Sequence, residues 1–194
     1  MTRMVLIMLL ILACLASQAP AQRRSPDPQA PAAAAGLKRH ETRYYILYTD
    51  LSDEEAREAA VRMTKMAEEY ADRTRDFAGA IRQKFDFYLF RDKEAYYAAG
   101  GPRGSAGVFD GQSLKAIAGE QLTDQTWHAV QHEGFHQFAH YVIGNDNMPI
   151  WVNEGLAEYF GEAIFTGDGF VSGVMPGWRV RRIKSAMRNE QFKT

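Results

Sequence analysis

Histidines recur at every fourth position in one stretch of the chain. His128, His132, His136 and His140 are four of the five histidines in the sequence. In an α-helix each step of four residues turns by about 40°, so these side chains form one stripe along a helix face. Within the stripe, His132, Glu133 and His136 form the pattern H-E-x-x-H.

This pattern suits a metal ion. Imidazoles at i and i+4 project from successive turns about 6 Å apart, so both can reach one tetrahedral zinc at about 2.0–2.1 Å. Glu133 sits one position round the helix from His132 and can face water near the metal without ligating it. The sequence therefore predicts Zn²⁺ held by His132 and His136, with Glu133 as general base. A cysteine-based zinc site is excluded, because Cys14 is the only cysteine.

A second motif follows in residues 151–160, which read Trp-Val-Asn-Glu-Gly-Leu-Ala-Glu-Tyr-Phe. With H-E-x-x-H, it resembles the gluzincin metallopeptidases, the thermolysin-like and aminopeptidase-like zincins. The resemblance is greatest to a bacterial family of uncharacterised gluzincin-like peptidases, and it covers residues 124–165. In gluzincins a Glu on the next helix, about twenty residues beyond the second His, is the third zinc ligand. Glu154 lies 18 residues after His136.

The resemblance implies a role for each matching residue. The zinc ligands would be His132, His136 and Glu154, and Glu133 would be the base. Glu158 matches the carboxylate that orients the first ligand histidine, and Asn153 matches an Asn for which we expect a backbone-binding role. The implied activity is hydrolysis of peptide bonds in a peptide or protein substrate by zinc-activated water.

We expect the helix that carries Glu154 and Glu158 to be mostly buried. These carboxylates flank four apolar or aromatic residues, Leu156, Ala157, Tyr159 and Phe160. A buried carboxylate needs a partner, and zinc is a suitable one.

Gluzincins also use a downstream Tyr or His to stabilise the transition-state oxyanion. After Glu158 the chain offers Tyr159 and no histidine. We expect Tyr159 to be a packing residue, so the donor is left to Tyr141 or to chain beyond Thr194. If the donor lies beyond Thr194, we expect the catalytic domain in this sequence to be incomplete.

A non-catalytic interpretation competes with the enzyme. An exported binding or scaffold module could keep zinc as a structural clip, and structural zinc sites have four protein ligands. His128 or His140 would supply the fourth ligand. In the enzyme interpretation, we expect both histidines only to pack or to form hydrogen bonds. Glu133 argues against this alternative, because a structural site needs no base.

The elements around the motifs predict an α+β domain of zincin-like type. A small mixed or antiparallel sheet precedes a motif helix and a third-ligand helix. We expect strands at 43–49 and 84–90, a hairpin of 108–109 and 114–118, and helices at 53–77, 92–98, 123–143, 149–165 and 179–190. The strand at 115–118 is expected to be the sheet edge along which a peptide aligns. The last helix is expected to turn Val180, Ile183 and Met187 inward.

The N-terminal region predicts export. Nine apolar residues at 5–13 follow Arg3, too few for a membrane span, and Ala19-Pro20-Ala21 is an A-x-A-like cleavage site. Residues 1–21 are therefore interpreted as a signal peptide, 22–40 as a Pro/Ala-rich linker and 41–194 as the catalytic domain. Alternatively, residues 11–14 form a lipobox and Cys14 carries a lipid anchor. The protein is then secreted or periplasmic, or anchored at the cell envelope.

Charge and composition bear on the class of partner and on whether the chain can build a core. The 194 residues include 23 basic and 24 acidic side chains, which gives no electrostatic reason to expect nucleic acid. An aromatic content of 12% is enough to build a core, so disorder throughout is excluded.

Overall fold

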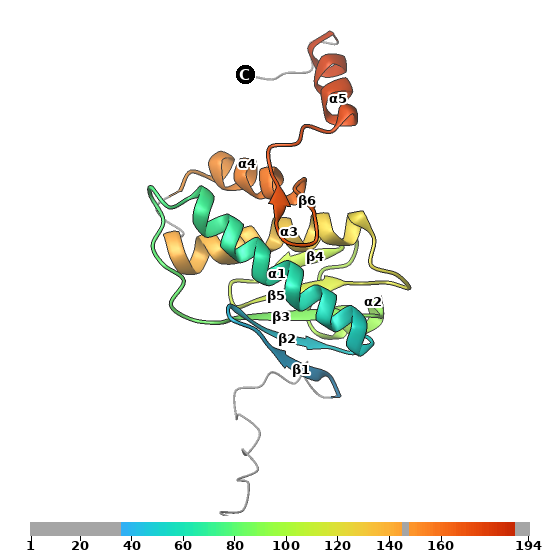
Figure 1. Cartoon of the computed structure of the whole chain (residues 1–194). Helices are drawn as coiled ribbons and strands as arrows, with labels where there is room; N and C mark the ends of the chain where they lie inside the picture. The colour runs from blue at the N-terminus through green and yellow to red at the C-terminus, as the bar shows by residue number, and fades with distance from the viewer. Residues whose placement is uncertain (1–35, 145–147, 189–194) are drawn as a thin grey trace, which may run out of the picture. The chain divides into compact units, whose positions relative to one another are not determined.

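The computed structural model of the chain describes residues 36–144 and 148–188 (Figure 1). The expected signal peptide, the lipobox with Cys14 and most of the expected linker lie outside these residues. Within them, no helix is both long and apolar enough to cross a membrane.

A five-stranded mixed sheet forms the base of the domain. Its strands are β1 (Lys38–Glu41), β2 (Tyr45–Thr49), β3 (Phe85–Phe90), β4 (Gly107–Phe109) and β5 (Ser113–Ile117), in the order β1-β2-β3-β5-β4. The three central strands are parallel, and the edge strands β1 and β4 run antiparallel to their neighbours. Helices accompany this sheet, which confirms the α+β prediction.

Strand β1 corrects the expected extent of the linker. The linker was expected to continue to residue 40, but Lys38 pairs with Thr49 and His40 with Leu47 of β2. The segment Lys-Arg-His-Glu has no alternation of apolar and polar residues, so its sequence carries no strand signal. Backbone pairing to the open edge of β2 forms this strand instead.

The expected peptide-aligning edge is also in a different place. Strand β5, which contains residues 115–117, lies between β3 and β4 and is internal. The hairpin places β4 outside it, because the Asp110 carboxylate accepts from the amides of Gln112 and Ser113 and closes the turn. The free edge beside the motif helix is therefore β4.

The helices are α1 (Asp53–Arg73), α2 (Lys93–Ala98), α3 (Asp124–Phe138), α4 (Ile150–Gly161) and α5 (Gly177–Arg188). A π-helical turn, η2 (Ala139–Ile143), extends α3, and a short hairpin of β6 (Ile164–Phe165) and β7 (Phe170–Val171) follows α4. The expected helices at 53–77 and 149–165 end earlier, at Arg73 and Gly161. Apolar spacing continues past both ends, so periodicity alone did not locate them.

Alternation along the strands separates two cores. Phe85, Phe87 and Leu89 of β3 face α1 and α3, which lie over the same face of the sheet (Figure 1). Tyr88 and Phe90 point to the opposite face, where Tyr96 of α2 packs on them. Helix α4 adds Ala157 and Phe160 to the first core and lies against α3.

Helix α5 does not bury its apolar face as expected. Ile183 is 47% exposed and Met187 is 63% exposed, and no residue of α5 is buried. Amphipathic spacing creates an apolar face but does not supply a surface to cover it. The contacts of α5 with the body come instead from Arg179, which is described below.

Candidate metal centre

Glycine at position 134 lets the motif helix lie close to α1. A Cβ atom there would be 2.9 Å from the Tyr70 hydroxyl oxygen and 3.0 Å from Met63 Cε. The Tyr70 hydroxyl also donates to the backbone carbonyl of Gln131 on α3. The face of α3 that carries the histidines is therefore turned away from α1 and toward α4.

Gln131 fixes the end of α4 beside α3. This buried side chain donates to the carbonyls of Phe160, Gly161 and Ala163 at 3.0, 3.2 and 3.1 Å. The last carbonyls of a helix have no partner within the helix, so a side-chain amide satisfies them well. The result is an antiparallel helix pair with a fixed register.

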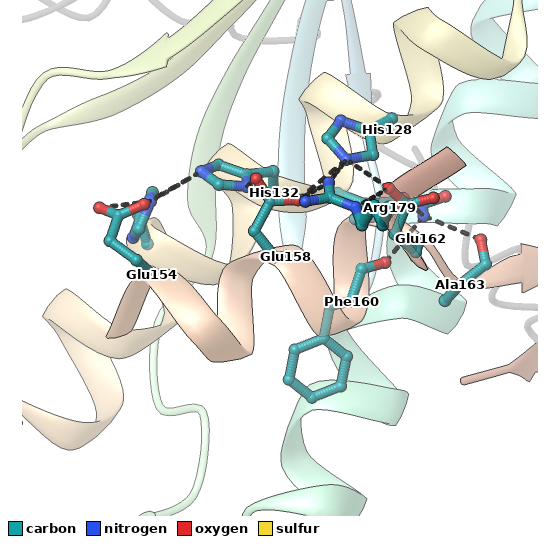
Figure 2. A network of polar contacts seen from close by, with 11 residues as sticks. His128, His132, Glu154, Glu158, Phe160, Glu162, Ala163 and Arg179 are labelled. Atoms are coloured by element: carbon teal, nitrogen blue, oxygen red, sulfur yellow. Dashed lines mark hydrogen bonds and ion pairs between the residues drawn. The ribbon is translucent and has the colours of Figure 1, made fainter. Parts of the chain in front are cut away.

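That register sets three histidines opposite three glutamates, an arrangement we call the His–Glu ladder. Its members are His128, His132 and His136 on α3 and Glu154, Glu158 and Glu162 on α4. Each set recurs every four residues, and the antiparallel register places the first histidine beside the last glutamate. The ladder is labelled in part in Figure 2.

One end of the ladder holds a set of three donors. His132 Nε2 and His136 Nε2 are 3.1 Å apart, and each lies 3.6 Å from an oxygen of Glu154. Donors placed tetrahedrally at about 2.0–2.1 Å from zinc lie roughly 3.3 Å from one another. The structure thus brings together the three residues expected to be ligands, at separations that one metal ion can bridge.

Asn153 orients the second histidine. Its carboxamide oxygen lies 3.2 Å from His136 Nδ1 and accepts a hydrogen bond from it. This contact leaves His136 Nε2 without a proton and directed at the other donors, which is the tautomer a metal needs. Among the described residues, the Asn153 side chain contacts a histidine, and the expected backbone-binding role stays a prediction.

His132 has a different environment. Its Nδ1 atom is buried without a hydrogen-bond partner, and the nearer oxygen of Glu158 is 3.9 Å away, beyond hydrogen-bond distance. Glu158 instead contacts His128 and Arg179. Burial lowers the pKa of His132, and the neighbouring His136 lowers it further. The imidazole is therefore neutral near pH 7, as a ligand must be.

Glu133 lies between α3 and the outer strand of the sheet. Its carboxylate accepts a hydrogen bond of 2.9 Å from the backbone amide of Phe109 on β4. A Cβ atom at Gly107 of the same strand would lie 3.5 Å from Glu133 Cγ. The carboxylate that follows His132 in the sequence is therefore held against the free edge of the sheet.

The helix that carries Glu154 is more open than expected. Ile150 and Trp151 are 81% and 78% exposed, and the side chain of Glu154 is 55% exposed. Only Ala157, Phe160 and Gly161 of α4 are buried. Helix α4 packs on one side alone, so its apolar residues do not all find cover. Glu154 is consequently reachable from solvent.

The other candidate residues make contacts of their own. The Tyr141 hydroxyl donates to the Gln112 carbonyl at 2.9 Å, in the β4–β5 turn. Tyr159 packs near Gly173, as expected for a packing residue. The His140 ring lies 5.3 Å from the Phe109 ring, between centroids. The Tyr141 hydroxyl is thus bonded to a backbone carbonyl, and the identity of the oxyanion donor stays a prediction.

Two residues of the site were missed in the sequence, Glu162 and Arg179. The Arg179 guanidinium donates to Glu162 from Nε at 2.8 Å and to Glu158 from Nη2 (Figure 2). Glu162 continues the four-residue repeat of Glu154 and Glu158, so its spacing was a usable signal. Arg179 gave none, because its contact forms only when α5 returns to α4.

Comparisons with known proteins assign the chain to no family. A scan against protein-family models, a search of curated proteins and a search of solved structures each found no match.

Proposed function

We propose that the protein is an exported, zinc-dependent peptidase of gluzincin type. The observation that carries the proposal is the convergence of His132, His136 and Glu154 from two helices, with the carboxylate of Glu133 held against the neighbouring strand β4. Two imidazoles and one carboxylate are typical ligands of catalytic zinc, which keeps three protein ligands and an open position. The exposure of Glu154 supports an open site.

Each residue has a defined task in this proposal. Zinc in such a site supplies Lewis acidity, which lowers the pKa of water and polarises a carbonyl oxygen. Glu133 accepts the proton of the attacking water and passes it to the leaving amine. Asn153 maintains the tautomer of His136 through the Nδ1 contact.

The outer strand β4 supplies a place for the substrate. It is an edge strand, and the Phe109 amide points away from β5 toward Glu133. An extended peptide can add to such an edge through main-chain hydrogen bonds. The substrate backbone would then pass beside the base.

The proposal is tested by zinc content and peptide cleavage on the same protein. Wild type should bind zinc and cleave a casein-type or quenched peptide substrate, and a chelator should abolish cleavage. Glu133→Gln removes the base but no ligand, so cleavage should fall by roughly 10²- to 10⁴-fold while zinc stays bound. Glu94→Gln is the matched control, because Glu94 lies on α2, over the other face of the sheet.

Two outcomes would contradict the proposal. Wild type that binds zinc but cleaves no substrate favours a binding module with a structural zinc. Equal cleavage by wild type and Glu133→Gln excludes Glu133 as the base.

A further inference from the structure

The far end of the His–Glu ladder holds a second set of three donors, formed by one imidazole and two carboxylates. His128 Nε2 lies 3.2 Å from an oxygen of Glu158 and 3.4 Å from an oxygen of Glu162. These separations match the roughly 3.3 Å between donors around a tetrahedral zinc. All three ligand atoms lie within 4.8 Å of one another, as they do in the first set.

A cation already lies against these three side chains. The guanidinium of Arg179 is paired with both glutamates, and its Nη2 atom lies 3.4 Å from His128 Nε2 (Figure 2). His128 Nε2 thus lies 3.2 and 3.4 Å from two carboxylate oxygens and 3.4 Å from the guanidinium.

The packing of α3 on α4 makes room for the imidazole of His128 beside the two carboxylates. A Cβ atom at Gly161 would lie 3.2 Å from His128 Nε2, so glycine there makes room for the ring over α4. The side chains of His128, Glu158 and Glu162 are 33%, 38% and 17% exposed. Two carboxylates this close and partly buried need a positive charge between them.

We propose that His128, Glu158 and Glu162 form a second divalent-cation site, which Arg179 of α5 closes by occupying it. One imidazole and two carboxylates are a donor set that suits Zn²⁺. The metal and the guanidinium exclude each other, since both bind the same carboxylate oxygens. This second site would bind a metal whether or not the protein is a peptidase.

Closure by Arg179 has a consequence for the first site. Glu158 belongs to both ends, because one of its oxygens contacts Arg179 and the other lies 3.9 Å from His132. While a cation holds Glu158 at the far end, His132 keeps its Nδ1 atom unpaired. Metal entry at the far end would also release α5 from the ion pairs that Arg179 makes with Glu158 and Glu162 of α4.

The test is zinc stoichiometry and affinity, measured by titration calorimetry and by metal analysis. Arg179→Gln should bind a second zinc at least about tenfold more tightly than wild type does, because a partly buried ion pair no longer competes. Arg182→Gln, on the same helix, should behave as wild type. Arg179→Gln with Glu162→Gln should lose the second zinc and keep the first.

Each result decides the proposal. Arg179→Gln that binds one zinc with wild-type affinity overturns it, as does a second zinc that survives Glu162→Gln. Arg179→Gln combined with His136→Ala should keep the second zinc, which separates this proposal from that of the first site. If Arg179→Gln does not fold, wild type in excess zinc should bind a second equivalent that Glu162→Gln lacks, and its absence in wild type overturns the proposal.

Discussion

The two ends of the His–Glu ladder have the same kinds of donor and the same helical spacing, yet different surroundings. At one end, the donors His132, His136 and Glu154 lie where the surface of α4 is open to solvent. At the other end His128 and two glutamates face the guanidinium of Arg179. Helix spacing repeats the donors, but a third element decides which set is available to a ligand.

A further difference lies within the open end, between the hydrogen-bond partners of its two histidines. His136 has Asn153 behind it at hydrogen-bond distance, whereas His132 has a buried nitrogen with no such partner. Both imidazoles point Nε2 at the same place. The ladder therefore supports one of its ligands better than the other.

The largest expected effect comes from removing a ligand of the open end. His136→Ala should weaken zinc binding by more than about 100-fold, since even loss of an outer partner costs 10- to 100-fold. His140→Ala is the matched control, because the next histidine of the stripe packs edge-on against Phe109 and belongs to neither set of donors. Competition against a fluorescent chelator measures both. Equal losses would show that the stripe, and not the three donors, binds zinc.

Asn153→Ala should weaken zinc binding by about 10- to 100-fold, because His136 would lose the contact that fixes its tautomer. Asn153→Asp keeps an acceptor at the same place and should retain most of the affinity. The same competition assay applies. Wild-type affinity in the alanine variant would mean that His136 is oriented by its helix alone.

Alanine substitutions at two glycines, one on α3 and one on α4, compare how tightly each helix is packed. Gly134→Ala should destabilise the fold by about 1–3 kcal/mol, because the new Cβ would press on Tyr70 and Met63. Gly155→Ala, with nothing within 4 Å, should stabilise α4 by roughly 0.5–1 kcal/mol. Urea unfolding of both variants measures this difference. Similar free energies of unfolding would contradict the close contact of α3 with α1.

Glu158→Gln should have the smallest effect on zinc affinity at the open end, less than about tenfold. The reason is that Glu158 lies 3.9 Å from His132 and is paired with Arg179 instead. A loss as large as that of Asn153→Ala would show that Glu158 turns to His132 when the metal binds.

Much of the fold followed from local patterns. The strands expected at 43–49 and 84–90 correspond to β2 and β3, and the helix expected at 53–77 corresponds to α1, which begins with a capping box of Ser52 and Glu55. The expected hairpin of 108–109 and 114–118 corresponds to β4 and β5. Strand β1 and the open face of α5 could not be predicted, because the first is formed by pairing to another strand and the second depends on whether a partner surface exists.

For the site, the sequence by itself determined which residues could act together along one helix. The spacing of four places His132 and His136 on one face whatever the rest of the chain does, because an α-helix has 3.6 residues per turn. The same rule puts Glu154 and Glu158 on one face of the next helix. These relations are local, so no knowledge of packing was needed.

Only the tertiary structure decided how the two faces meet. Gln131 sets the register of α4 against α3, which brings Glu154 to the two histidines and Glu158 to His128. Arg179 comes from a helix that begins 16 residues after Gly161, and no spacing rule links it to its glutamates. Long-range contacts depend on the packing of the whole core, so one ladder of histidines and glutamates acquires an open end and a closed one.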